Sequence, residues 1–150
     1  MTSPGYEAVE VGTRWQSTGR TLTEADLSWS CMSSGDWHPI HADEEFARST
    51  PAGRRIFQGT FGLHVAAGLA TAFPQLGDDV LGALGFSDWR FLQPLYVGDT
   101  LHVEVEITGK RVSSSAGRGV IERHIRLVKH DGVIAQEGRA ALLARTGVSE

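Results

Sequence analysis

Residues 59–73 are Gly-Thr-Phe-Gly-Leu-His-Val-Ala-Ala-Gly-Leu-Ala-Thr-Ala-Phe. This pattern predicts a helix that is apolar on almost every side, and Pro74 ends it. A helix with this pattern is expected to be buried rather than to lie on the surface. Its glycines, Gly59, Gly62 and Gly68, each cost about 1 kcal/mol relative to alanine inside a helix. We therefore expect other backbone to pack closely against it.

The pattern changes to that of strands after Gly77. At least four antiparallel strands are expected, at residues 80–96, 101–107, 120–128 and 133–145. A flexible loop at residues 113–117 and a hairpin turn at Asp131-Gly132 separate the last three. Helices followed by consecutive antiparallel strands define an α+β fold. One buried helix against one curled antiparallel sheet is the simplest arrangement that hides these apolar residues.

The chain before the apolar helix predicts short helices and loops. Thr23 is a helix cap followed by acidic residues in the first turn, and this helix should stop near residues 33–35. Pro39 excludes a continuous helix through the next loop, residues 35–41. Asp43 then caps another short helix. Residues 1–12 are expected to be a loose lead-in or an edge strand.

Length and composition indicate one globular domain, residues 1–150, with 41% hydrophobic and 21% charged residues. The single cysteine, Cys31, cannot form an internal disulfide bond. Residues 1–10 do not resemble a secretory signal, and no apolar run reaches the roughly 20 residues of a membrane-spanning helix. The net charge of −4 argues against nucleic-acid binding. We therefore expect a cytoplasmic protein with a small-molecule ligand.

Asp36 and His41 are the residues most capable of catalysis. They are separated by a loop that Pro39 stiffens, so both side chains could converge on one water molecule. Such general acid–base catalysis typically contributes about 10²–10⁴-fold in rate. The amide of Gly59 begins the apolar helix, where it has no acceptor within the helix and could hydrogen-bond a developing enolate oxygen.

Other roles for these residues are open from their types and spacing alone. An aspartate after glycine, such as Asp36, is more often a turn or cap residue than a catalyst. A lone histidine close to a proline, such as His41 two residues after Pro39, is more often a hydrogen-bonded surface or core residue than a catalyst. His38, His41 and Asp43, with His64, do not form a recognised closed zinc pattern, and no metal is expected.

Gly35-Asp36-Trp37-His38-Pro39-Ile40-His41-Ala42-Asp43, followed by Arg55-Ile56-Phe57-Gln58-Gly59, resembles the MaoC-like, (R)-specific enoyl-CoA hydratases. Their motif is Gly-Asp-x-Asn-Pro-Ile/Leu-His-x-Asp and then Ile-x-His-Gly. Residues 91–101 are also similar, and the resemblance covers about residues 15–145. This chain differs at two positions, because His38 replaces the asparagine and Gln58 replaces the histidine before the glycine.

The resemblance implies a hotdog fold, in which the sheet wraps a central helix, and a homodimer. It implies syn addition of water to the 2,3-double bond of an acyl thioester, on coenzyme A or acyl carrier protein, or the reverse elimination, without a cofactor and within fatty acid metabolism. Asp36 and His41 would be the catalytic pair, and Gly59 would supply the oxyanion-hole amide. Four further residues are expected at the substrate: His38, Arg55, Gln58 and Thr60.

Two other functions are compatible with the same fold. Thioesterases with this fold usually carry a carboxylate on the central helix, and residues 59–73 contain neither aspartate nor glutamate. A non-catalytic thioester-binding or accessory subunit could keep the fold after losing the chemistry, and the changes at His38 and Gln58 keep that alternative open. The sequence favours the hydratase over both.

Overall fold

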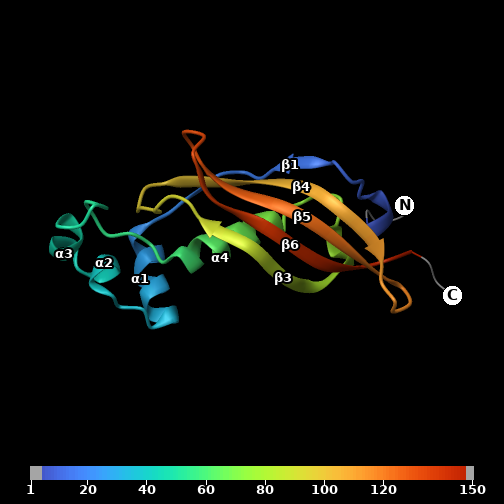
Figure 1. Cartoon of the computed structure of the whole chain (residues 1–150), viewed down its shortest axis with the longest axis horizontal. Helices are drawn as coiled ribbons and strands as arrows, with labels where there is room; N and C mark the ends of the chain where they lie inside the picture. The colour runs from blue at the N-terminus through green and yellow to red at the C-terminus, as the bar shows by residue number, and fades with distance from the viewer. Residues whose placement is uncertain (1–4, 148–150) are drawn as a thin grey trace.

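The computed structural model describes residues 5–147, and it has the α+β architecture expected from the sequence (Figure 1). The helices are two short 3₁₀ turns, η1 (Tyr6–Ala8) and η2 (Gly77–Asp79), and four α-helices, α1 (Glu24–Ser34), α2 (Pro39–Ala42), α3 (Glu44–Arg48) and α4 (Gly59–Ala70). The strands are β1 (Arg14–Gln16), β2 (Arg20–Thr21), β3 (Val80–Phe91), β4 (Thr100–Val112), β5 (Arg118–Lys129) and β6 (Ile134–Arg145).

The strands form one sheet of order β1-β4-β5-β6-β3, with β2 also paired to β4. All pairs are antiparallel. The four long strands overlap the predicted ranges, but β3 ends at Phe91 instead of residue 96 and β4 continues to Val112 instead of residue 107. Strands β1 and β2 were not predicted, because strands of three and two residues are too short to show a period. Strand β3 is an edge of the sheet, and its outer backbone groups have no neighbouring strand among the described residues.

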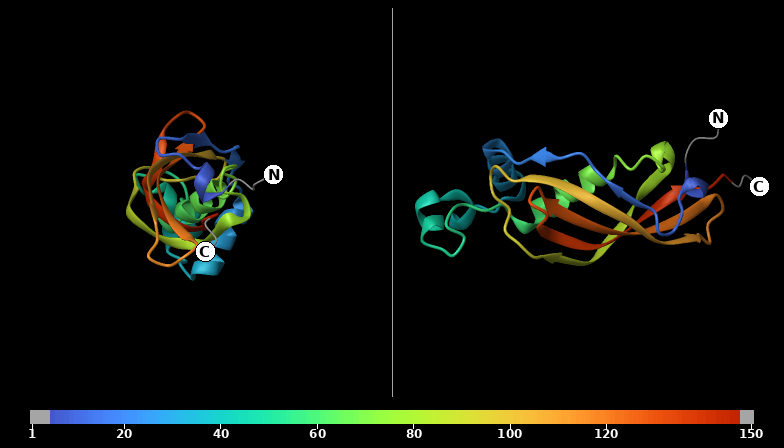
Figure 2. Two further views of the ribbon diagram at one scale, coloured as in Figure 1. Left: turned by 90° about the vertical axis from the view of Figure 1, so that its right-hand side faces the viewer. Right: turned by 90° about the horizontal axis from the view of Figure 1, so that it is seen from above.

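The sheet curls around α4, as the view along the long axis shows (Figure 2, left). Phe61 and Val65 on the helix belong to one buried cluster with Val103, Ile125 and Leu127 on the strands, each 4% exposed or less. Burying an aliphatic or aromatic side chain of this size stabilises a fold by about 1.5–3 kcal/mol relative to leaving it exposed. This cluster therefore holds α4 to the concave face of the sheet.

Helix α1 has the boundaries that its capping residues predicted. The hydroxyl of Thr23 accepts a hydrogen bond from the Asp26 amide, and the Asp26 carboxylate accepts one from the Thr23 amide. Gly35 ends the helix in the left-handed region, with φ of 72°. Helices α2 and α3 follow, and together with α1 they form a helical arm, residues 24–48, which extends past the end of the sheet (Figure 2, right).

Helix α4 differs from its prediction in length and in burial. It ends at Ala70, three residues before the predicted end, and Thr71 forms its C-cap. Only one face is buried, because the sheet covers one side; His64 and Gly68 on the other side are exposed. The expectation of a helix buried all round is therefore wrong for a single chain, and a strip of α4 is open to solvent.

The glycines of α4 are explained by side chains rather than by the neighbouring backbone that we expected. A Cβ atom added at Gly59 would lie 2.6 Å from the ring of Phe91, and one at Gly62 would lie 2.2 Å from the amide of Gln136. At Gly68 nothing lies within 4 Å. Two of the three glycines therefore permit a close approach, and packing gives no reason for the third.

Membrane insertion through a helix has no support in the described part of the chain, where none of the helices combines sufficient length with sufficient hydropathy to span a bilayer.

Candidate active site

Asp36 and His41 face each other at the junction of the helical arm and the central helix. Asp36 lies in the loop after α1, and His41 lies on the one-turn helix α2, which begins at Pro39. The sequence placed His41 in a loop, but proline is well tolerated at the first position of a helix. The Asp36 Oδ2 to His41 Nε2 distance is 3.4 Å. The side chain of His41 is 11% exposed and that of Asp36 is 45% exposed.

The ring of His41 is oriented by a backbone carbonyl. Its Nδ1 lies 2.6 Å from the carbonyl oxygen of Ile56. Because a carbonyl oxygen can only accept, Nδ1 must carry the hydrogen in this contact. In the neutral ring Nε2 is then an acceptor directed toward Asp36. His41 therefore does not point to solvent, as a purely structural surface histidine would.

The Asp36 loop is held by hydrogen bonds on both sides of the carboxylate. Asp36 Oδ1 accepts from the backbone amide of His38 at 3.1 Å, which makes a local turn. The hydroxyl of Ser34 accepts from the Asp36 amide at 3.1 Å. Asp36 thus performs the turn role that its sequence context suggested, and its second oxygen still faces His41.

Gln58 anchors this loop through buried hydrogen bonds. It is 5% exposed, and its Oε1 accepts a hydrogen bond from the hydroxyl of Ser30 at 2.5 Å. Its Nε2 donates to the carbonyl oxygen of Asp36 at 3.0 Å and lies 3.4 Å from the sulfur of Cys31. The side chain of Gln58, which was expected to contact the substrate, therefore forms its hydrogen bonds with other groups of the protein. It joins α1 to the Asp36 loop.

Gly59 is the first residue of α4 and borders an open pocket of about 300 Å³. Ile56, Phe91, Leu95 and Gln136 are among the other residues that line this pocket. The first N–H groups of a helix have no partner within it and lie at the positive end of its dipole. The side-chain amide of Gln136 donates to the Gly59 carbonyl oxygen at 2.9 Å, which fixes the start of the helix.

Arg55 is engaged by two carboxylates of the helical arm. Its guanidinium lies 2.6 Å from Glu44 and 2.7 Å from Glu24. The hydrogen bond from Arg55 holds the pKa of the Glu44 carboxyl below its usual value, and the hydrogen bond to Glu44 raises the pKa of Arg55. Arg55 thus ties α1 to α3. The guanidinium that was expected at the substrate is therefore paired with carboxylates of the protein.

His38 and Thr60, the other residues expected at the substrate, are both exposed. His38 is the N-cap of α2, where its Nδ1 accepts from the amide of Ile40 at 3.2 Å. Its ring centroid is 6.3 Å from that of His41. Thr60 lies in the first turn of α4. No group of three or more metal-ligating side chains gathers within the described residues.

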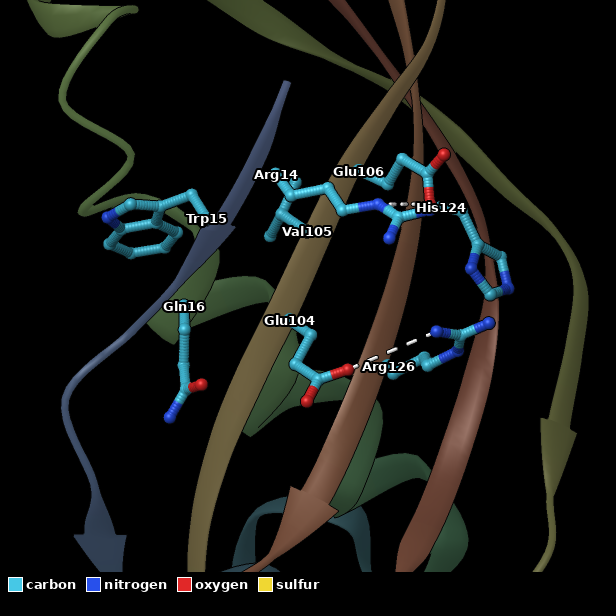
Figure 3. Close-up of a pocket in the computed structure, with 8 residues that line it drawn as sticks. All are labelled: Arg14, Trp15, Gln16, Glu104, Val105, Glu106, His124 and Arg126. Carbon is cyan, nitrogen blue, oxygen red and sulfur yellow. Dashed lines mark ion pairs between the residues drawn. The ribbon is translucent and has the colours of Figure 1, made fainter. Parts of the chain in front are cut away.

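A second pocket, of about 360 Å³, lies on the outer face of the sheet, away from α4 (Figure 3). Its walls carry paired charges: Arg14 lies 3.3 Å from Glu106, and Arg126 lies 4.0 Å from Glu104. None of the predicted site residues lines it. These charges compensate one another at a polar surface, and His124, which also lines the pocket, lies 3.4 Å from Glu137.

Three residues that support the pair were not identified from the sequence. The carbonyl of Ile56 orients His41, the hydroxyl of Ser30 holds Gln58, and the amide of Gln136 holds Gly59. Every residue has a backbone carbonyl, so the residue type at position 56 could not indicate this contact. Gln136 did carry a signal, because it is a polar residue in an otherwise apolar strand face, where it is 1% exposed.

The fold and this site define a hotdog protein with an aspartate–histidine pair beside the start of its central helix. A family described as "MaoC like domain" matches residues 8–126, and the chain belongs to that family. It is 33% identical over 120 residues to protein MaoC of Klebsiella aerogenes, with 79% of this chain and 34% of that protein covered. The chain thus spans about a third of that relative.

Two further relatives are named as enzymes. A 3-hydroxybutyryl-CoA dehydratase of Methylorubrum extorquens is 33% identical over 104 residues, which cover 68% of this chain and 62% of that protein. An (R)-specific enoyl-CoA hydratase of Aeromonas caviae is 27% identical over 137 residues, which cover 91% and 96% of the two chains. The family to which the chain belongs therefore includes hydratases.

Solved structures agree on the fold. A protein of Archaeoglobus described as a monoamine oxidase regulatory protein superimposes with a TM-score of 0.88, 26% identity and 97% of both chains covered. A Mycobacterium tuberculosis protein described as having a double hotdog fold gives a TM-score of 0.84 at 17% identity, over 99% of this chain and 46% of that one. The hotdog fold expected from the sequence is confirmed.

Proposed function

We propose that this protein is a hydratase or dehydratase that adds water to, or removes it from, the 2,3-double bond of an acyl thioester. The observation that carries the proposal is the Asp36–His41 pair, with Oδ2 and Nε2 facing each other at 3.4 Å. The names of relatives from the MaoC-like family support the same chemistry. On this proposal Asp36 and His41 are the catalytic residues.

The pair supplies two acceptors for one water molecule. A carboxylate oxygen and an imidazole Nε2 whose partner nitrogen is protonated both accept hydrogen bonds. A water at about 2.8 Å from each atom would lie off the line that joins them and would donate one hydrogen to each. Its lone pairs would then be directed away from the pair, toward a substrate carbon.

Hydration follows from that arrangement in balanced steps. The water oxygen bonds to the β-carbon of the enoyl thioester, and the pair takes one proton from the water. The electrons of the double bond move to the thioester carbonyl and give an enolate oxygen. The pair then returns the proton to the α-carbon, so one molecule of water is added. Because both groups lie on the same side of the substrate, addition is syn; dehydration is the reverse.

The enolate would be stabilised by the amide of Gly59. Loss of one oxyanion donor raises a barrier by about 2.7–4 kcal/mol in enzymes that use such a group. The pocket beside Gly59 is the proposed position of the thioester, carried by coenzyme A or by acyl carrier protein. Helix α4 carries no aspartate or glutamate, and this favours hydration over thioester hydrolysis. Cytoplasmic location stays a prediction.

The direct test follows the loss of the enoyl thioester absorbance with a panel of short, medium and branched acyl groups on coenzyme A and on acyl carrier protein. We expect turnover of at least one class of substrate and an (R)-3-hydroxyacyl product. No turnover across both panels by a folded protein would contradict the proposal and leave a non-catalytic thioester-binding subunit as the alternative.

The proposed functional form is a homodimer joined through β3. This edge strand carries large apolar side chains that are 40% exposed or more: Val80, Leu81, Leu84, Phe86 and Phe91. An edge with unpaired backbone groups and bare apolar side chains pairs readily with another strand. A second copy would cover this edge together with the exposed strip of α4.

Light scattering tests the dimer. We expect twice the monomer mass for the wild type and a monomer for Leu84→Lys, because a lysine on β3 opposes edge pairing. Val112→Lys is the matched control, since Val112 is 70% exposed near the end of β4 and away from this edge. A wild-type protein that is monomeric and fully active would contradict the proposed dimer.

A further inference from the structure

Arg123 is a charged residue at a position where the sheet otherwise carries apolar side chains. It lies on β5 between Ile121 and Ile125, which are both fully buried in the core, and the strand pairs with β6 without a register shift in this region. Alternate residues of a strand share one face. Arg123 therefore faces the concave, α4-covered side of the sheet, where it is 8% exposed.

The guanidinium of Arg123 has no compensating partner among residues 5–147. Its Nε is buried without a hydrogen-bond partner, and no ion pair to the described carboxylates is formed. Burial alone lowers the pKa of Arg123 to about 10, which still leaves it protonated at neutral pH. A buried, unpaired charge is destabilising. The fold therefore carries an energetic cost that a bound anion would offset.

Arg123 borders a cavity of about 360 Å³ whose walls are otherwise almost entirely apolar. It also borders a more open and more polar pocket, which Glu122 and Arg139 line as well. Ala67 and Ala70 line it from α4, Ala83 and Phe86 line it from β3, and Leu142 lines it from β6. Ligand sites of this size are typically apolar with a few polar groups that fix orientation. A ligand that fills this cavity would therefore combine a hydrocarbon chain with a terminal anionic group.

The cavity and the proposed thioester position lie along the same helix. A helix rises about 1.5 Å per residue, so Ala67 and Ala70 are about 12 and 17 Å along α4 from Gly59. An extended chain covers about 3.5 Å for three bonds, so roughly ten to fourteen bonds span that distance. An acyl chain of about twelve carbons that starts at the pocket beside Gly59 is therefore long enough to reach the level of this cavity along α4.

We propose that Arg123 is a specificity-determining residue that binds the carboxylate at the far end of a medium-chain ω-carboxyacyl thioester. The planar guanidinium suits a carboxylate, because two parallel N–H···O bonds can form. The ligand would neutralise the buried charge, and its methylene chain would contact the alanines of α4. This inference rests on the proposed hydratase function for the position of the thioester, but it does not depend on turnover for its test.

The first experiment compares selectivity between two coenzyme A thioesters of equal length, 2-dodecenoyl-CoA and its ω-carboxylated counterpart. We expect wild type to prefer the ω-carboxylated substrate, and Arg123→Gln to lower the ratio of kcat/KM values by roughly tenfold or more, since hydrogen bonds to charged groups are strong when buried. Arg126→Gln is the matched control, because Arg126 lies on the same strand but on the outer face. An equal ratio in all three proteins overturns the proposal.

The second experiment needs no turnover and separates this inference from the proposed function. We expect dodecanedioate to raise the denaturation midpoint of wild type more than dodecanoate does, and Arg123→Gln to abolish that difference. Arg123→Met without ligand should be at least as stable as wild type, because an unpaired buried charge is removed. If dodecanedioate gives no greater shift than dodecanoate, no carboxylate site exists. If Arg123→Gln instead dissociates a dimer, the residue pairs with the second copy and the proposal is overturned.

Discussion

Replacement of Gln58 by leucine should destabilise the protein, whereas the same replacement at Gln75 should not. Gln58 is 5% exposed and has three partners, which are Ser30, Cys31 and the carbonyl of Asp36. Gln75 has a buried Oε1 without a partner among the described residues. The two substitutions remove the same amide, but only the first leaves protein groups without their hydrogen bonds.

The size of the effect follows from those bonds. A buried group left without its partner costs about 1–3 kcal/mol, and Gln58→Leu leaves the buried Ser30 hydroxyl and the Asp36 carbonyl in that state. We expect a loss of about 2–4 kcal/mol in the free energy of unfolding, which is roughly 4–16 °C in the denaturation midpoint for a chain of this length. Gln75→Leu should leave stability unchanged or increase it.

Urea denaturation followed by circular dichroism, at one fixed protein concentration, measures both changes. Turnover by the folded fraction of Gln58→Leu should also fall, because the Asp36 loop loses its buried anchor. Equal stabilities for the two variants would refute the conclusion that Gln58 is an anchor. Loss of turnover without loss of stability would mean that Gln58 contacts the substrate, as the sequence suggested.

Two further predictions concern packing and charge. Gly62→Ala should lower the free energy of unfolding by about 1–3 kcal/mol, because its Cβ would displace the amide of Gln136. Gly68→Ala should raise it by up to about 1 kcal/mol, since nothing lies near this position. Thermal denaturation of both variants measures the two changes. The pKa of Glu44 is lowered by Arg55, so their interaction stabilises the fold above the ordinary value of 4.5 and is lost as the pH falls below it. Arg55→Met should therefore weaken the acid-induced loss of stability, measured by urea denaturation at a series of pH values.

Most of the fold could be predicted from residue patterns. Thr23 and Gly35 mark the ends of α1 as they were expected to, and the alternating residues of β4 and β5 lie in long antiparallel strands. The end of α4 was missed, because Ala72 and Phe73 continue the apolar pattern after Thr71 has capped the helix. Apolar pattern alone therefore overestimated both the length of α4 and the burial of its outer face.

The proximity of the two proposed catalytic residues could be predicted, because their residue types themselves suggest the chemistry. Asp36 and His41 were identified from their types and from the proline between them, and they do face each other. Arg55 and Gln58 were expected at the substrate, but their partners come from α1 and α3, which only the folded chain brings near. Arg123 carried a signal that was not used, because it occupies an inward-facing position of an alternating strand.

The measurement that tests the central claim most directly is the hydration rate of Asp36→Asn beside that of Asp131→Asn. The two aspartates have the same local role: each accepts the backbone amide two residues later at 3.1 Å, and asparagine can keep that bond. Only Asp36 faces a histidine at 3.4 Å. With a substrate that the wild type turns over, we predict that Asp36→Asn loses about 10²-fold or more in kcat while its stability is retained, and that Asp131→Asn keeps the wild-type rate. Near-normal turnover by Asp36→Asn would show that Asp36 is a turn residue and would contradict the proposed mechanism.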